Sequence, residues 1–415
     1  MNIPKGLNDL LPEEVLRRRF LEDKISQVFK EWGYQEIITP VFEFYETLSQ
    51  SAGSIMKKGM IKFFDREGNI IALRPEMTTP IARVTSTKLK RELKPLRFYY
   101  ISNVFRHNDL KMGERKEFNQ AGIELIGVNS KEADVEVIAL AVETLKNSGL
   151  KKFFIDIGHI NLFNGIMQSI KIEEERKLQI REAILNKDFV LLERILSSSD
   201  IRNDKEKEFI LKMPTLRGKE EILEEAEKIL SNRLSIFALK EIKGIYNILR
   251  SYGLEEHILI DLGIIRDFDY YTGIIFEGYT DYLGFPICGG GRYDSLCLKF
   301  GENLPATGFA IGLERLIMAL ERENVNVLNL KRPEQYVLYY QKSEDNFRKA
   351  LAVAKDLRKK GLIIELEVGK RTFAEVLQYA RSKGIKYILV VNAKQPNKIK
   401  KVEVVSGEEE IINYE

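Results

Sequence analysis

The sequence is poor in cysteine and histidine, and it lacks the short motifs of several common enzyme classes. Its 415 residues include two cysteines, Cys288 and Cys297, and three scattered histidines. With no CxxC spacing and no histidine cluster beside them, the cysteines predict two reduced thiols and no metal site. The chain has no GxGxxG, GxxxxGKS/T or GxSxG motif and no paired-histidine motif, so it gives no sign of these nucleotide, hydrolase or zinc sites.

Charge of one sign and long apolar runs are also lacking. The 65 basic and 62 acidic residues give a net charge of +3, which makes no case for nucleic acid or a membrane surface as partner. No apolar run approaches the roughly 18–20 residues that span a bilayer. The first residues, MNIPKGLNDL, lack the basic start and apolar stretch of a signal peptide, so we expect a cytoplasmic protein.

The length of the chain and the changes in sequence pattern along it predict more than one domain. Residues 1–150 alternate helix and strand patterns, whereas about 165–255 is rich in Lys, Glu, Leu and Ile with helical periodicity. Strand patterns and glycine turns then return, which indicates one domain interrupted by a helical insertion. Residues 331–415 predict a small α/β domain with a mostly parallel sheet. That segment holds 18 basic and 12 acidic residues, which fits either a nucleic-acid contact or a solvated lysine-rich face.

One predicted strand, 117–127 (EFNQAGIELIG), separates its apolar and polar side chains. Side chains alternate across a sheet, so Ala121, Ile123 and Leu125 should pack on a core. Gln120 and Glu124 share the opposite face with a glycine between them. This face either forms a polar sheet surface with open space next to it or is an ordinary solvent-facing surface.

Further polar residues interrupt apolar segments elsewhere. In 72–83 (ALRPEMTTPIAR), Glu76 and Thr78 follow a strand and could cap a helix. In 264–277 (IIRDFDYYTGIIFE), Arg266 is expected either to pair with Asp269 or to be offered to an anionic ligand. The glycine run before Arg292 and Tyr293 reads as a flexible segment or a structural turn, and Arg315 alone reads as a surface residue of a helix.

Together these residues meet the requirements for binding an amino acid. Glu76, helped by Thr78, suits an ammonium group, and Arg266 suits a carboxylate. Glu124 and Tyr271 could accept hydrogen bonds from a ligand side chain that carries N–H donors.

At these residues the sequence resembles the histidyl-tRNA synthetase family. Residues 105–127 resemble its second class II motif, 264–277 its histidine-binding signature, and 289–316 its glycine turn and third motif. Pro40 falls where the first motif has its proline, on a dimer-forming strand. The resemblance implies an α+β class II aminoacyl-tRNA synthetase-like fold, with an antiparallel sheet flanked by helices. It implies a domain at 1–325, with the helical insertion at about 165–255, and an α/β anticodon-binding-like domain at 326–415.

The resemblance also implies a histidine pocket. The matching positions are Glu76, Thr78, Gln120, Glu124, Arg266, Tyr270, Tyr271 and Tyr293. Asp267 and Phe268 stand where the signature usually has glycine and leucine.

The ATP-binding positions of the family are altered. The family's Arg-x-Glu, whose glutamate holds adenine, is Arg106-His107-Asn108 here, and its ATP-contacting arginine after the loop glycine is Glu114. Arg315 stands at the arginine of the third motif. A carboxylate in place of a phosphate-binding arginine should cost several kcal/mol of triphosphate affinity. Arg106, Asn108, Glu114 and Arg315 therefore mark a degenerate ATP site, and we expect no catalytic residue and no cofactor.

A histidine pocket without ATP resembles the synthetase paralogues that serve as regulatory subunits of short-form ATP phosphoribosyltransferase. Segments 7–14, 72–83 and 304–313 match these paralogues better than true synthetases, which have glycine where Met77 stands. The resemblance implies a non-catalytic homodimer within a hetero-octamer. Its catalytic partner condenses ATP with phosphoribosyl pyrophosphate in the first step of histidine biosynthesis, and histidine inhibits it by feedback. tRNA is not an expected partner, and no membrane association is implied.

Two other functions fit the same residues. One is an active histidyl-tRNA synthetase (histidine–tRNA ligase), which the anticodon-binding-like domain at 326–415 favours. The other is a stand-alone amino-acid sensor with a different partner.

Overall fold

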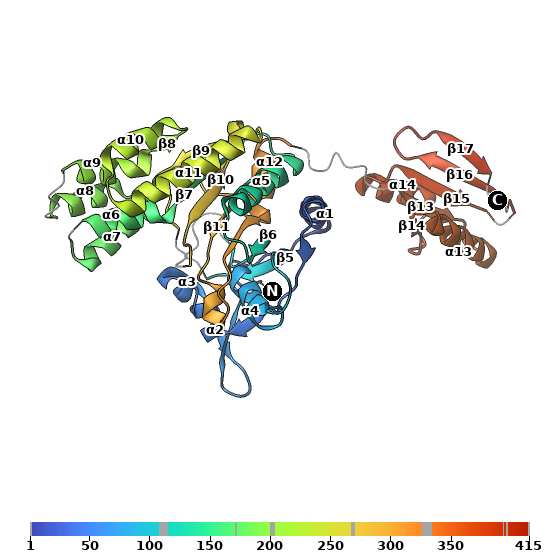
Figure 1. The fold of residues 1–415 in the computed structure, drawn as a ribbon. Coiled ribbons are helices and arrows are strands. Elements are labelled where there is room, and N and C mark those ends of the chain that lie inside the picture. The colour runs from blue at the N-terminus through green and yellow to red at the C-terminus, as the bar shows by residue number, and fades with distance from the viewer. Residues whose placement is uncertain are drawn as a thin grey trace. The chain divides into compact units, whose positions relative to one another are not determined.

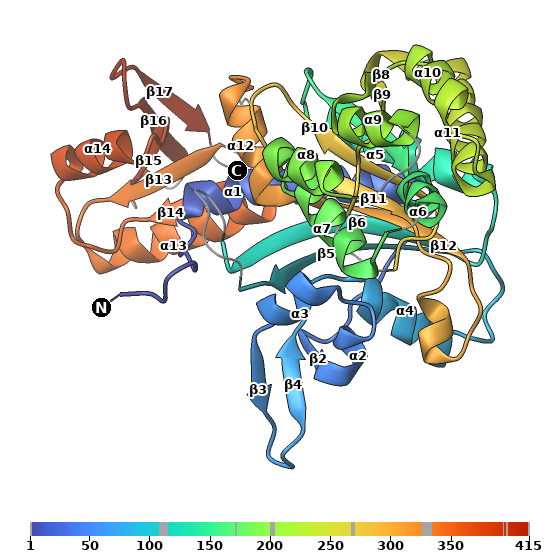
Figure 2. The same cartoon turned by 90° about the vertical axis from the view of Figure 1, so that its left-hand side faces the viewer.

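The computed structural model describes residues 2–107, 115–170, 172–199, 204–266, 270–325, 334–392, 394–395 and 397–413. The chain forms two compact units, Met1–Asn326 and Val327–Glu415. Figures 1 and 2 show the elements of each unit from two directions. No helix within the described ranges is both long enough and apolar enough to cross a membrane.

The first unit is built on a nine-stranded sheet with the order β1-β5-β6-β12-β11-β10-β7-β9-β8. Its strands are β1 (Gln35–Glu36), β5 (Leu96–Phe105), β6 (Glu117–Ile126), β7 (Phe154–His159), β8 (Arg217–Gly218), β9 (Ile258–Asp261), β10 (Ile274–Tyr279), β11 (Cys288–Arg292) and β12 (Ala306–Gly312). The central strands, from β5 to β7, are antiparallel, but the β1·β5 and β7·β9 pairs are parallel. The sheet is therefore antiparallel through its centre, as expected, with one parallel pair toward each end. Long connections, residues 37–95 between β1 and β5 and 160–257 between β7 and β9, allow the parallel pairs.

Several helices of the first unit pack against this sheet, among them α1 (Pro12–Glu31), α5 (Lys131–Asn147) and α12 (Leu313–Arg322). In α1 the residues Leu21, Ile25, Val28 and Phe29 recur at helical spacing and are buried, as the sequence predicts. Gly33 adopts φ +81 just after the helix, a conformation that favours glycine and ends the helical run.

A set of helices forms the connection between β7 and β9. Its members are α6 (Ile160–Ser169), α7 (Glu174–Leu185), α8 (Phe189–Ser197), α9 (Asp204–Lys212), α10 (Glu221–Ile229) and α11 (Arg233–Ser251). Figure 1 shows α7 to α10 gathered together at one end of the first unit. The two-residue strand β8 lies within this region and pairs with β9, so the region is not purely helical. Among these helices, α11 packs on α6 and α5, which ties the region to the sheet.

The segment around Pro40 is not one continuous strand, because the chain changes direction at the proline. The chain leaves β1 before Pro40 and begins β2 (Phe42–Phe44) after it, and the two strands belong to different sheets. A proline has no N–H for a sheet ladder, which explains the break. The small sheet has the strand order β2-β4-β3. Its strands β3 (Lys62–Phe64) and β4 (Ile70–Leu73) form an antiparallel hairpin, which projects from the unit in Figure 2. Helices α2 (Tyr45–Ser49), α3 (Ser54–Gly59) and α4 (Thr78–Thr87) flank it in sequence.

The second unit is a five-stranded sheet with two helices. Its elements are β13 (Gln335–Tyr340), α13 (Glu344–Lys359), β14 (Ile363–Leu366), α14 (Phe373–Ser382), β15 (Tyr387–Val391), β16 (Lys398–Glu403) and β17 (Glu409–Asn413). The first three strands are parallel, but β15·β16 and β16·β17 are antiparallel. The predicted mostly parallel sheet is therefore only half right, because the short connections from β15 to β16 and from β16 to β17 leave no room for the crossover that a parallel pair needs.

Candidate functional site

A cavity of about 660 Å³ opens in the first unit, a size typical of small-molecule sites. It is lined by all of the positions that the family resemblance assigns to a histidine pocket: Glu76, Thr78, Gln120, Glu124, Arg266, Tyr270, Tyr271 and Tyr293. They come from four separate stretches of the chain, and only the fold brings them together. Arg106 and Arg315 line the same cavity.

Glu124 is almost fully buried and is held in place from two sides. Its carboxylate accepts hydrogen bonds from the Thr78 hydroxyl, at 2.8 Å, and from the Tyr293 hydroxyl. The neighbouring strand makes room for it at Gly308, where a Cβ would lie 2.1 Å from the Glu124 Oε2 atom. Any larger residue at position 308 would therefore displace the carboxylate. Ala121, Ile123 and Leu125 are buried on the opposite face of β6, as the alternation predicts.

Two of the carboxyl groups that line the cavity, those of Glu124 and Glu76, have raised pKa values. Burial raises the pKa of Glu124 to about 8, although the hydrogen bonds from Tyr293 and Thr78 oppose the shift. Burial also raises the pKa of Glu76, against hydrogen bonds from Thr79 and the charge of Arg106. The charge of Glu76 also raises the pKa of Glu124. A ligand that brings N–H donors or a positive charge would stabilise the ionised form of both carboxyl groups.

We expect the ligand-free chain to lose stability as the pH rises from about 4.5, the ordinary value for Glu124, to about 8, its raised value. Across that window the folded state holds a proton that the unfolded state has released, so the free energy of unfolding falls with pH. Glu124→Gln removes the titration. Thermal unfolding at pH 6 and pH 8 should therefore show a smaller fall in Tm for the variant than for the unaltered chain. Identical falls would mean that Glu124 does not titrate in this range.

Glu76 lies at the start of α4 and caps it. Both of its carboxylate oxygens accept from the Thr79 backbone N–H at 3.1 Å. The capping interpretation is thus correct for Glu76, yet the same side chain also lines the cavity. The neighbouring Arg74 is purely structural, because it is buried and donates to the backbone oxygens of Thr39 and Asn103.

Arg266 contacts an acidic residue that the sequence analysis did not single out. Its guanidinium lies 3.2 Å from Glu277 on β10 and donates to the Phe276 carbonyl oxygen. Asp269, the partner that we considered from the sequence, lies outside the described residues, as do Asp267 and Phe268. Glu277 is part of the same sequence segment as Arg266, but only the turn back along β10 shows that the two side chains meet.

The glycine run is a central strand and not the flexible segment or turn that we expected. Gly289, Gly290 and Gly291 pair with β10 on one side and with β12 on the other. A Cβ at Gly289 would lie 1.9 Å from the Arg266 guanidinium nitrogen Nη1. The missing side chain therefore leaves the space that Arg266 occupies. Arg292, at the end of the run, is buried and pairs with Asp134 at 2.9 Å, so its role is structural.

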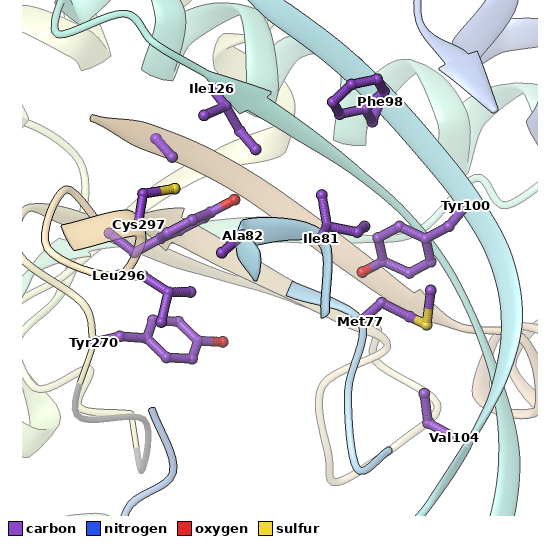
Figure 3. Close-up of a cluster of buried hydrophobic side chains, with 12 residues drawn as sticks. Met77, Ile81, Ala82, Phe98, Tyr100, Val104, Ile126, Tyr270, Leu296 and Cys297 are labelled. Atoms are coloured by element: carbon purple, nitrogen blue, oxygen red, sulfur yellow. The ribbon is translucent and has the colours of Figure 1, made fainter. Parts of the chain in front are cut away.

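Aromatic rings form one side of the cavity. The rings of Tyr270 and Tyr271 have centroids 4.8 Å apart, and those of Tyr270 and Tyr293 are 5.7 Å apart. Tyr270 and Tyr293 belong to a buried cluster that also includes Tyr100 and Met77 (Figure 3). Met77, which stands where true synthetases have glycine, is thus a core residue here.

Cys297 lies in the same buried cluster (Figure 3), and Cys288 is buried in β11. Both are free thiols. Burial raises the pKa of Cys288 to about 12 and that of Cys297 to about 11, so both stay protonated and unreactive near neutral pH.

Gln120 adds a polar group without a protein partner. Its Oε1 atom is buried, and no hydrogen-bond donor reaches it among the residues that the structure describes. A buried carbonyl oxygen left unpaired costs about 1–3 kcal/mol. A ligand or water that donates to Gln120 would offset that cost.

The remaining predicted positions are those that the family resemblance assigns to ATP. Arg106 donates to the Pro75 carbonyl oxygen at 2.8 Å, and Arg315 donates to the Pro286 carbonyl oxygen at 2.8 Å. Asn108 and Glu114 lie outside the described residues. Arg115, directly after Glu114, lines the cavity and was missed from the sequence, because only the altered motif position was considered.

Comparison with known proteins gives a consistent result. The family model for histidyl-tRNA synthetase matches residues 6–316, and the anticodon binding domain model matches residues 326–411. A protein of Acetivibrio thermocellus named ATP phosphoribosyltransferase regulatory subunit is 43% identical over 94% of this chain and 92% of its own length. A protein of Moorella thermoacetica with the same name is 40% identical over 93% of this chain and 97% of its own length.

Solved structures agree with the sequence relatives. An ATP phosphoribosyltransferase regulatory subunit/histidyl-tRNA synthetase from Bacillus halodurans superposes with a TM-score of 0.81 and 32% identity, covering 94% of this chain and 97% of its own. A histidyl-tRNA synthetase from Nostoc has a TM-score of 0.80 at 24% identity, covering 99% of this chain and 96% of its own. The second match bears on the fold alone. Together they confirm the expected class II synthetase-like fold with a C-terminal α/β unit.

Proposed function

Because the chain belongs to the family of ATP phosphoribosyltransferase regulatory subunits, which has the histidyl-tRNA synthetase architecture, we propose that it regulates a catalytic ATP phosphoribosyltransferase subunit by binding histidine. The observation that carries this proposal is the single cavity that collects all eight positions matching the family's histidine contacts. The chain itself then catalyses no step. Histidine, the end product of the pathway, would act as a feedback inhibitor through it.

The charges of the cavity suit a bound histidine. Its ammonium group would lie at Glu76, where a nearby positive charge would stabilise the buried carboxylate, and its carboxylate would pair with Arg266. Glu124, at the base of the cavity, would accept from an imidazole N–H, and Gln120 offers a buried oxygen that lacks a donor within the described part of the chain. In this arrangement the ligand would donate to buried oxygen atoms of Glu76, Glu124 and Gln120, and so would offset the free-energy cost of burying them.

We also propose that the chain works as a homodimer joined to the short-form catalytic subunit in a hetero-octamer. The small sheet and the segment leading into it expose an unusual number of apolar side chains, which is typical of an interface. They are Ile38, Val41, Phe42, Phe44, Phe63, Phe64 and Ile70. This exposed apolar surface begins beside Pro40, where the family resemblance places the dimer-forming strand.

The chain alone is expected to sediment as a dimer at micromolar concentration. Phe64, which is 73% exposed, contributes to the apolar surface that would be covered, so Phe42→Ser/Phe64→Ser should shift the chain toward monomer. Leu178→Ser, at an exposed leucine of α7, serves as the matched control and should leave the dimer intact. A chain that is monomeric without any substitution would contradict the homodimer.

The isolated chain is expected to show no histidine-dependent ATP–pyrophosphate exchange. The reason is the altered ATP positions, Asn108 and Glu114, where the family has glutamate and arginine. The assay should be paired with calorimetry of histidine binding on the same preparation. Binding without exchange supports a sensor, whereas robust exchange at ordinary enzyme concentrations would make the chain a synthetase.

A further inference from the structure

A second cavity of about 350 Å³ lies away from the histidine pocket, in the first unit. Its charged lining comes from β7, β8, β9, the segment after β10 and the turn between α7 and α8. The residues are Asp156, Asp261, Asp281, Arg217 and Lys187, with Tyr279 beside them. Three carboxylates thus face two basic side chains across a space large enough for a small ligand.

Asp156 is a buried group of this cavity, and one of its two carboxylate oxygens has a hydrogen-bond partner within the described residues. Its side chain is 3% exposed, and its Oδ2 atom accepts from the Arg217 Nε atom at 2.8 Å. Its Oδ1 atom is buried and has no hydrogen-bond partner among the residues that the structure describes. A carboxylate oxygen left in this state is costly, so the site has an open position for a donor.

Asp261 places a second carboxylate on the same side of the sheet. Asp156 is paired with Leu259 in the parallel ladder, so Asp261, two residues further, shares its face. The Oδ1 atom of Asp261 accepts from the Gly263 N–H at 2.8 Å. Burial raises the pKa of Asp261 to about 6, and the charge of Asp156 adds to the shift, while Arg217 and Lys187 oppose it. A positive group between the two carboxylates would relieve their repulsion.

The ligand chemistry follows from these groups. Within the described residues no cluster of three or more ligating side chains could hold a metal ion. An alkylammonium group instead offers three N–H donors and a positive charge on an apolar stem. Lys187 and Arg217 at the same cavity would attract a carboxylate carried by the same ligand.

A series of contacting side chains, Tyr279, Glu277 and Arg266, connects this cavity to the histidine pocket. The Tyr279 hydroxyl donates to Glu277 at 2.6 Å, and Glu277 lies 3.2 Å from Arg266, which lines the histidine pocket. Glu277 is also the direct ladder neighbour of Asp156. A cation bound at Asp156 would stabilise the charge of Glu277 and compete with Arg266 for it. The guanidinium would then be more available to a ligand carboxylate.

We propose that the second cavity binds an alkylammonium group, and that the side chains Tyr279, Glu277 and Arg266 couple its occupancy to the first cavity. The ammonium group belongs either to a free zwitterionic amine or to a lysine side chain of a partner protein. The binding site itself stands independently of the proposed function. The coupling rests on it, because it assumes that histidine occupies the first cavity.

Calorimetry on the full chain tests the site with three probes: n-butylamine, 6-aminohexanoate and Nα-acetyl-lysine methylamide. We expect saturable binding that weakens at least about 10-fold in Asp156→Asn, since a charge-assisted contact is lost. Asp261→Asn is the second variant in case the first does not fold, and Asp345→Asn, exposed on α13, is the control that should change nothing. Tighter binding of 6-aminohexanoate than of the other two probes identifies a free zwitterion, whereas equal binding of all three identifies a lysine side chain.

Two results would overturn the proposal. The site is wrong if the folded chain binds none of the probes saturably, or binds them equally well in both aspartate variants. For the coupling, the tightest probe is expected to raise histidine affinity by about fivefold, the lower end of usual coupling, and Tyr279→Phe should reduce that gain. Unchanged histidine affinity at saturating probe overturns the coupling alone. If histidine does not bind at all, the proposed function fails, while the probe titrations without histidine still decide the site.

Discussion

Histidine affinity is expected to fall by roughly 30- to 1,000-fold when Arg266 is replaced by alanine. In the proposed complex Arg266 is the partner of the ligand carboxylate, and losing such a charge-assisted contact costs on the order of 2–4 kcal/mol. Glu277 and the Phe276 carbonyl oxygen hold the guanidinium in the space beside Gly289 before the ligand arrives. Calorimetry of histidine binding to the unaltered chain and the variant measures the loss.

The controls for this experiment come from the same cavity. Arg266→Ala removes the partner of the Glu277 carboxylate, so the double variant Arg266→Ala/Glu277→Gln separates loss of ligand contact from an uncompensated buried charge. Arg315→Ala removes another arginine that lines the same cavity, and should leave histidine affinity within about threefold. Wild-type affinity in both Arg266 variants would place the histidine site elsewhere.

The second large effect is loss of feedback inhibition in the complex with the catalytic subunit. Glu124→Gln keeps the size of the side chain but removes the group that can ionise when a ligand N–H or positive charge reaches the cavity. We expect the histidine concentration for half-maximal inhibition to rise at least about 10-fold. Activity without histidine should persist, because the proposed function places the chemistry on the partner. ATP phosphoribosyltransferase assays over a histidine series give the result.

The physical reason is that inhibition is a coupling free energy between two sites, about 1–3 kcal/mol in typical cases. Histidine shifts the complex only by binding one of its states better than the other. Reciprocity requires that substrates favouring the active state weaken histidine binding by the same factor. Glu321→Gln, an exposed glutamate at the rim of the cavity, is the matched control. If Glu124→Gln assembles and histidine still inhibits at the unaltered concentration, this subunit is not the sensor.

Much of the first unit could be predicted from local pattern. The two-residue alternation of β6 placed Ala121, Ile123 and Leu125 in the core and Glu124 on the opposite face, as the structure confirms. Helical spacing likewise identified the buried side of α1. These predictions succeed because periodicity is a property of neighbouring residues, and burial of one face follows from it.

The errors arose where a distant segment decides the outcome. The glycine run before Arg292 suggested flexibility, yet in the structure it is a central strand whose missing side chains admit Arg266. The sequence pattern suggested Asp269 as the partner of Arg266, but in the structure Arg266 contacts Glu277. The parallel pairing of β7 with β9 also depends on a helical connection of nearly a hundred residues, which no local pattern reports.

The residue types can be read from the amino-acid sequence alone: the carboxylates, arginines and tyrosines of the pocket, the departures from the family's ATP motif, and the periodicities of each helix and strand. Folding adds the rest: Glu76, Glu124 and Arg266 line one cavity, burial raises the pKa of Glu124 to about 8, and Asp156 and Asp261 line a second cavity. The reason is that desolvation and charge interactions depend on distances through space. Those distances are set by the packing of segments far apart in the chain.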